Sequence, residues 1–156
     1  MALSISSPSF SDGGAIPAKY TCNGEDVSPP LEISGVPQDA GSLVLILDDP
    51  DAAREPAGIG RTYDHWIVFN IPPLTTSIPE ATVPGGSVLG KNDFGRQKYG
   101  GPCPPTFEHT YSFRLYALNC KLRLQKGASK HDVESRMTGH VLESATLTGV
   151  YKQPRM

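Results

Sequence analysis

Three apolar or alternating segments in the middle of the chain predict β-strands. Residues 43–48, LVLILD, and residues 65–71, HWIVFNI, are short and nearly continuous apolar runs, which are typical of strands buried on both faces. Residues 110–118, TYSFRLYAL, alternate instead, with apolar side chains at every second position from Tyr111 to Ala117. Since side chains alternate across a strand, this segment predicts one well-buried face and one mixed face.

Helical signals gather near the C-terminal end of the chain. Ser129 is a candidate N-cap, and Asp132 three residues later fits a capping-box pattern. Apolar side chains then recur at helical spacing, at Val133, Met137, Val141 and Ala145. We therefore expect a helix here and a last strand or extended tail at residues 146–151, while residues 121–124 are read as a further sheet edge.

These elements predict a mostly β fold, all-β with one or two short helices. The chain has 156 residues, shows no internal repeat or dividing linker, and is long enough to bury a core without disulfides or metals. We therefore expect residues 1–156 to form a single domain. The 16 glycines and 15 prolines are spread along the chain, which indicates many ordered loops and not a disordered tail.

The charge pattern excludes some partners. A formal net charge of -2 gives no electrostatic reason to expect nucleic acid or an anionic membrane. No apolar run is long enough to span a bilayer, and MALSISSPSF at the start does not look like a signal peptide. A cytoplasmic protein is expected on these grounds. The three cysteines, Cys22, Cys103 and Cys120, are then expected to be free thiols, with one bridge as the alternative.

Polar side chains that could do chemistry stand at the ends of the three predicted strands. Asp49 follows the first run, His65 begins the second, and His109 precedes the third with Tyr111 two residues on. Because residues two apart in a strand share a face, His109 and Tyr111 can point into one place. If the three strands are neighbours, an aspartate, two histidines and a tyrosine converge there.

Each of these signals also has a plain structural explanation. Asp-Pro-Asp at residues 49–51 is a good turn, and a histidine at a strand start is often only a hydrogen-bonded structural residue. The segment KYGGPCPPTFEHTYSF, residues 98–113, could simply be a rigid loop. His131 and His140 are assigned to a helix start and to a packed helix face.

Several segments together resemble the phosphatidylethanolamine-binding protein family, in its bacterial and archaeal branch of Raf kinase inhibitor-like, or YbhB/YbcL-type, proteins. They are SPSFSDGGAIPAKYTCNGEDVSPPLEI, DDPDAA, DHWIVFNIP, NDFGRQKYGGPCPP, HTYSFRLYAL and MTGHVLESATLTGVY, and they cover nearly the whole chain. The resemblance implies a large central antiparallel sheet packed on a smaller sheet, with a helix near the C-terminus. It also implies a small pocket at the sheet edge that binds anions such as phosphate or phosphoethanolamine.

Carried over by motif, the resemblance implies that a set of residues lines this pocket: Asp49, Tyr63, His65, Gly100, Gly101, Pro104, Pro105, His109 and Tyr111. The glycines would let backbone N–H groups approach an oxyanion, and the prolines would hold the loop in shape. Asp49 would accept from a ligand ammonium, or hold His65 or His109 protonated. Two departures from the family pattern, Ala53 for proline and Thr110 for arginine, bear on loop rigidity and on ligand affinity.

Several functions follow as hypotheses. The first is a non-catalytic binding or regulatory protein that recognises a phosphorylated small molecule, lipid head group or protein, and that acts as a kinase or protease inhibitor-like modulator. This hypothesis requires no cofactor and is compatible with a homodimer. The alternative is a hydrolase or lyase that uses Asp49, His65 and His109 as an acid–base set, with Cys103 as the one candidate nucleophile. A metal site of two histidines and one aspartate is a third hypothesis, which the spacing does not favour.

Overall fold

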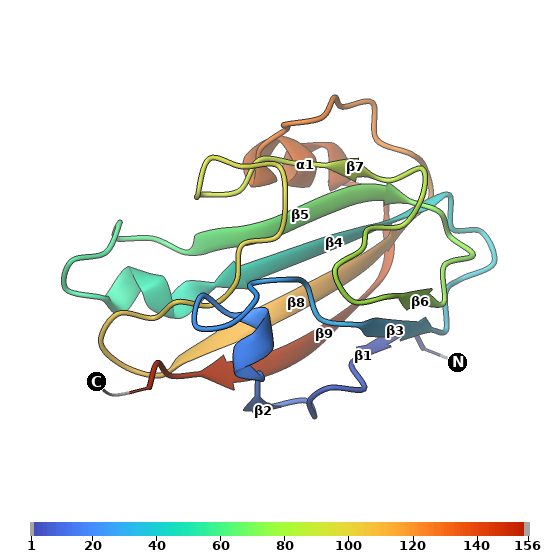
Figure 1. Cartoon of the computed structure of the whole chain (residues 1–156). Helices are drawn as coiled ribbons and strands as arrows, with labels where there is room; N and C mark the ends of the chain where they lie inside the picture. Colours follow the sequence, from blue (N-terminus) through green and yellow to red (C-terminus); the bar gives the residue numbers. More distant parts are fainter. Residues whose placement is uncertain (1, 155–156) are drawn as a thin grey trace.

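The computed structural model describes residues 2–154, whose strands form two β-sheets (Figure 1). The large sheet has the strand order β2-β9-β8-β4-β5-β7, and the small sheet has the order β1-β3-β6. The strands are β1 (Ser4–Ser6), β2 (Gly14–Ala15), β3 (Leu31–Ser34), β4 (Ser42–Asp49), β5 (Tyr63–Ile71), β6 (Ser77–Ile78), β7 (Val88–Leu89), β8 (His109–Leu118) and β9 (Val141–Tyr151). One α-helix, α1 (Lys130–Met137), and two 3-10 turns, η1 (Ala18–Tyr20) and η2 (Pro50–Arg54), complete the elements.

The three predicted strands are confirmed as β4, β5 and β8, and they lie side by side. β4 is central and pairs antiparallel with β5 on one side and with β8 on the other. All eight residues of β4 are buried, as its continuous apolar pattern predicts. Because β4 runs against both neighbours, its C-terminal end lies beside the N-terminal ends of β5 and β8.

The large sheet has a separate apolar core on each face. Leu43, Leu45 and Leu47 of β4 belong to the core that includes residues of the small sheet. Val44 and Ile46 belong to the second core, which includes Val133 and Met137 of α1. The small sheet and α1 therefore cover opposite faces of the large sheet (Figure 1). We call these faces the inner face and the outer face.

The predicted helix is correct at its start and wrong at its end. Ser129 and Asp132 form a capping box, so α1 begins where the sequence predicts. The helix ends at Met137, and Gly139 follows with a positive φ of 83°, a conformation that glycine adopts without strain. Val141 and Ala145 lie in β9, which pairs along the whole of β8. His131 lies in α1, whereas His140 is an exposed turn residue and not part of a helix face.

The expected sheet edge at residues 121–124 is also wrong, because this segment is irregular. The Asn70 side chain donates to the carbonyl of Leu122 and accepts from its N–H, at 2.9 and 2.8 Å. A single amide thus takes the place of a strand partner for that residue. The short strands β1, β2, β3, β6 and β7 were not predicted, since segments of two to four residues carry little periodic signal.

The expectation of three free thiols is wrong for two of them. Cys22 and Cys103 form a disulfide with a Cα–Cα distance of 5.5 Å, and Cys120 is free. The bond joins the segment after η1 to the proline-rich loop before β8. Within residues 2–154, none of the three helical elements combines the length and the apolar character that crossing a membrane requires.

Candidate functional site

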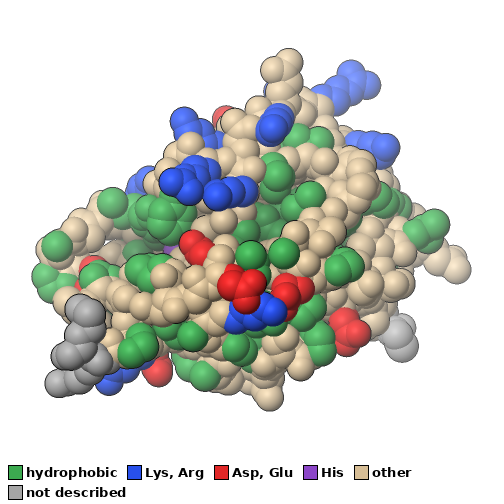
Figure 2. Space-filling model, in the orientation of Figure 1, with side chains coloured by type: hydrophobic (Ala, Val, Ile, Leu, Met, Phe, Trp, Pro, Cys, Tyr) green, Lys and Arg blue, Asp and Glu red, His purple; other side chains and the backbone are tan. Residues whose placement is uncertain are grey.

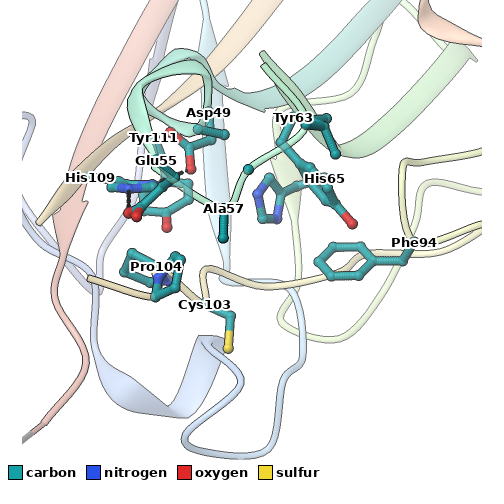
Figure 3. Close-up of a pocket in the computed structure, with 14 residues that line it drawn as sticks. Asp49, Glu55, Ala57, Tyr63, His65, Phe94, Cys103, Pro104, His109 and Tyr111 are labelled. Carbon is teal, nitrogen blue, oxygen red and sulfur yellow. Dashed lines mark hydrogen bonds and ion pairs between the residues drawn. The ribbon is translucent and has the colours of Figure 1, made fainter. Parts of the chain in front are cut away.

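The adjoining ends of β4, β5 and β8 bring together the polar side chains that the sequence singled out. Asp49 ends β4 and stands opposite Tyr63 at the start of β5, while His109 begins β8. His65 and Tyr111 follow two residues into their strands and therefore share the faces of Tyr63 and His109. Figure 3 shows these side chains around one cavity. The hypothesis of three neighbouring strands is confirmed by the sheet pairing.

The cavity has a volume of about 280 Å³ and is partly open to solvent. Hydrophobic side chains surround the hollow at the left of the face in Figure 2, in keeping with a mostly apolar lining. Of the residues carried over by motif, seven line it: Asp49, Tyr63, His65, Pro104, Pro105, His109 and Tyr111. Gly100 and Gly101 are not among the lining residues.

The two glycines have a structural role behind the cavity wall. The N–H of Gly100 donates to the carbonyl of His65, and that of Gly101 donates to the Asp26 carboxylate, at 3.0 and 2.8 Å. A Cβ at Gly100 would come within 2.5 Å of the Phe94 ring, and one at Gly101 within 2.4 Å of Asp26. These N–H groups already have protein acceptors, so the glycines permit close packing here and are not open donors for an oxyanion.

A buried imidazole between two carboxylates forms the polar centre of the site. His109 Nδ1 lies 2.6 Å from Asp49 Oδ2, and His109 Nε2 lies 2.6 Å from Glu55 Oε2. The three side chains are only 1 to 4% exposed. An imidazole donates from both nitrogens only when it is protonated, so this geometry fits an imidazolium that donates to both acids.

The two carboxylates respond differently to this environment. Burial raises the pKa of Asp49, against the opposing effect of its hydrogen bond from His109. Asp49 Oδ1 has no hydrogen-bond partner among the described residues. Burial also disfavours the charged form of Glu55, but hydrogen bonds from Thr106 and His109 outweigh it and lower the pKa of that acid. Of the two acids, Asp49 is therefore the one whose charged form is disfavoured and the one with an acceptor oxygen that is unpaired within residues 2–154.

His65 presents a hydrogen-bond acceptor to the cavity and not a donor. Its Nδ1 lies 2.7 Å from the carbonyl of Gly100, and a carbonyl can only accept, so Nδ1 carries the proton. Burial lowers the pKa of His65 to about 4, which keeps the ring neutral at neutral pH. The remaining nitrogen, Nε2, is then a lone-pair acceptor.

Aromatic rings form the other side of the cavity. The Tyr63 ring centroid lies 5.2 Å from that of His65 and 5.0 Å from that of Phe94. Tyr63 donates its hydroxyl to the carbonyl of Asp93, which holds the ring in place. Tyr111 is fully buried against both histidines, and burial raises the pKa of its hydroxyl. The phenol thus stays a neutral group in the cavity wall.

Neither a nucleophile nor a metal centre is apparent in this arrangement. Cys103 lines the cavity, but its sulfur is bonded to Cys22 and is not a free thiol. The described residues contain no group of three or more histidine, cysteine or acidic side chains placed to hold a metal ion. The nitrogens of His109 point to opposite sides of one ring, so Asp49 and Glu55 do not converge with them on a single point.

Glu55 and Phe94 are two of the cavity-lining residues that sequence reasoning missed, together with small and apolar residues of the same loop as Glu55. Glu55 follows η2 in the polar loop between β4 and β5, where an acid is normally solvated. The signal available was its place six residues after Asp49 in a loop that leaves the same sheet edge. Among residues 2–154, no lysine or arginine lines the cavity. Thr110, which stands in place of an arginine, is exposed, and its N–H donates to Asp51 at 2.8 Å.

Comparisons with known proteins agree with this fold. Residues 6–152 match the family model described as phosphatidylethanolamine-binding protein. A UPF0098 protein of Methanothermobacter thermautotrophicus is 49% identical, over 97% of this chain and 99% of its own. A UPF0098 protein of Chlamydia trachomatis is 39% identical, over 97% of this chain and 99% of its own.

Two crystal structures are also similar to the chain. A phosphatidylethanolamine-binding protein homologue from Chlamydia trachomatis superposes with a TM-score of 0.93 at 39% identity, covering 98% of this chain and 99% of that one. YbcL of E. coli, described as a member of the mammalian family, gives 0.88 at 30% identity, covering 99% and 100%. The chain therefore belongs to the phosphatidylethanolamine-binding protein family, in its bacterial and archaeal branch.

Proposed function

We propose that this chain is a non-catalytic binding protein whose cavity receives a phosphate or phosphoethanolamine-like head group on a small molecule or lipid. The observation that carries the proposal is the buried Asp49–His109 pair at the wall of a cavity that also presents His65. Burying titratable groups costs stability, and buried titratable groups with perturbed pKa values in a cleft are typical of functional sites. The family description, which names a binding protein, points the same way.

The polar atoms of the cavity suit a ligand that carries both signs of charge. His65 Nε2 is an acceptor that favours an ammonium group, and the buried Asp49 Oδ1 is a second acceptor without a partner among the described residues. His109 is the donor of the site, and it can donate to a phosphate oxygen in exchange for one of its two carboxylate partners. A bare phosphate meets acceptors as well as the donor, so a zwitterionic head group is the better match. A volume of about 280 Å³ suits a head group and not a large substrate.

The acid–base enzyme is the weaker hypothesis on these contacts. Both nitrogens of His109 are occupied by carboxylates, and His65 donates its one proton to a backbone carbonyl. A general base needs a free lone pair within reach of the proton that it removes, and within the proposed set only His65 Nε2 and the buried Asp49 Oδ1 offer one. If the chain modulates a kinase or protease, the same cavity would bind a phosphorylated group on that partner.

The test is a titration followed by NMR on the histidine ring signals. Phosphoethanolamine should shift the signals of His65 and His109, and should leave those of exposed His131 and His140 in place. The His109→Ala variant should lose the ligand, while His140→Ala, a histidine outside the cavity lining, should bind like the native protein. Equal binding by both variants would contradict the proposal.

A further inference from the structure

Glu55 is a deeply buried acid that comes from an exposed loop. Its side chain is 3% exposed, whereas its neighbours Arg54 and Pro56 are exposed. The residues that follow, Ala57 to Gly60, are exposed as well. A charged side chain is rarely buried so fully unless its contacts compensate for lost hydration. The contacts of Glu55 are therefore the reason for its inward position.

Each carboxylate oxygen of Glu55 has its own donor, one in the cavity wall and one on Thr106 just outside the cavity lining. Oε2 lies 2.6 Å from His109 Nε2, and Oε1 accepts from the hydroxyl of Thr106. An imidazolium N–H and a hydroxyl are the donors that an incoming phosphate oxygen would need. In Figure 3 the Glu55 carboxylate ends beside the His109 ring, on the side facing Pro104. It thus occupies the donors that a bound oxyanion would use.

The loop that carries Glu55 has anchors on either side and few contacts between them. Before Glu55, the Asp51 carboxylate accepts from the N–H of Thr110. After it, Arg61 makes a bidentate pair with Asp93 at 2.9 and 3.1 Å. The backbone bonds of Glu55 are local, from its N–H to Ala52 and from Gly58 to its carbonyl. Withdrawing Glu55 therefore breaks its two side-chain contacts and spares both anchors.

We infer that Glu55 is a built-in carboxylate ligand of this cavity, which holds the oxyanion position on His109 until the phosphate group of a ligand displaces it. The inference rests on the proposed function, since it concerns the same cavity and the same class of head group. It adds a specificity-determining residue. With Glu55 in place, His109 is shared by two acids, and no lysine or arginine among residues 2–154 lines the cavity to offset them, so a phosphate without an ammonium partner is disfavoured.

The decisive measurement is the Kd of inorganic phosphate for the native chain and for Glu55→Ala, Glu55→Gln and Glu108→Gln. Glu108 is an exposed neighbour of His109 outside the cavity lining, so its substitution removes the same charge without vacating a donor. Glu55→Ala should bind phosphate at least about tenfold more tightly than the native chain, because a buried like charge is removed and two donors are freed. Glu108→Gln should bind like the native chain, since an exposed charge is screened.

Several outcomes decide the inference separately from the proposed function. Phosphate binding by both Glu55 variants that is no tighter than that of Glu108→Gln would overturn it, even if the native chain binds phosphoethanolamine. Glu55→Gln keeps the side-chain volume and decides the matter if thermal unfolding shows that Glu55→Ala does not fold. If the Glu55 variants also bind glycerophosphoethanolamine, a diester, more tightly than the native chain does, the ligand is a lipid head group. If the gain in affinity is limited to monoesters, the ligand carries a free phosphate group. Either pattern supports displacement of Glu55.

A second readout uses the native sequence. The carboxyl ¹³C signal of Glu55 should move when phosphoethanolamine binds, because the carboxylate loses His109 and Thr106 as donors. A Glu55 signal that stays in place while those of His65 and His109 shift would show that the head group binds beside Glu55. That result would overturn the displacement and leave the binding function intact.

Discussion

Asp48 and Asp49 are neighbours at the end of β4, both nearly fully buried, yet they face opposite sides of the sheet. On the outer face, Asp48 pairs with two permanent cations, Arg114 at 3.1 Å and Lys130 at 2.9 Å. On the inner face, Asp49 pairs with His109, which it shares with Glu55. Asp48 therefore has two cationic partners for its single negative charge, whereas Asp49 shares one imidazole with a second acid.

The difference separates a structural cluster from a binding site. Lys130 also reaches Asp64 at 3.3 Å, so the outer cluster has two cations for two acids and joins α1 to β4 and β5. The inner cluster has two acids for one imidazole and a cavity beside it. Both clusters bury charged groups, but within the described residues only the inner one leaves acidic groups without enough cationic partners beside a cavity. That uncompensated charge indicates a ligand-binding site.

The largest expected effect is a loss of folding stability at low pH, and it comes from His65 on the inner face. Its pKa falls from 6.5 to about 4 in the folded state, so the unfolded chain takes up a proton first as the pH falls. Stability is therefore complete above pH 6.5 and is lost towards pH 4 by about 3 kcal/mol. Urea unfolding between pH 4 and pH 7 measures this loss. His65→Gln should show a flatter profile, and His140→Gln should keep the native slope; equal slopes for all three would count against a neutral buried His65.

Removing one cation from the outer cluster should have the next largest effect. In Lys130→Met, Asp64 loses its ion pair and Asp48 keeps only Arg114. The unfolding free energy should fall by about 2 kcal/mol, because a buried carboxylate is left short of donors. Lys121→Met, at an exposed position, is the matched control and should change stability little. Binding of phosphoethanolamine should persist in both variants, and its loss in Lys130→Met would show that the two faces are coupled.

Neutralising Asp49 on the inner face should have the smallest effect on folding stability and a strong effect on ligand binding. Burial raises the pKa of Asp49 above 3.8, so the charged form opposes folding increasingly as the pH rises from there. Asp49→Asn should therefore change the unfolding free energy at pH 7 by about 1 kcal/mol or less, and should weaken binding of phosphoethanolamine strongly. Denaturant melts and the same NMR titration measure the two effects. A large loss of stability would place Asp49 with Asp48 as a structural acid.

Prediction from the sequence succeeded where a pattern repeats along a strand. The apolar runs located β4, β5 and β8, and the alternation in β8 named its buried face. The helix was extended too far because Val141 and Ala145 also fit a helical spacing, and only pairing with β8 places them in β9. Asp49, His65 and His109 were found because they stand at the ends of strong strands. Glu55 was missed because a single acid in a polar loop has no pattern around it.

The sequence by itself determined which segments become the central strands and which of their side chains share a face, because both depend on a two-residue period that is local. It also carried the motifs that identify the family over nearly the whole chain. The tertiary structure alone decided that Cys22 bonds Cys103 and that Glu55 turns inward to share His109 with Asp49. These choices depend on which loops and faces meet in space, and burial there gives each charge its effect.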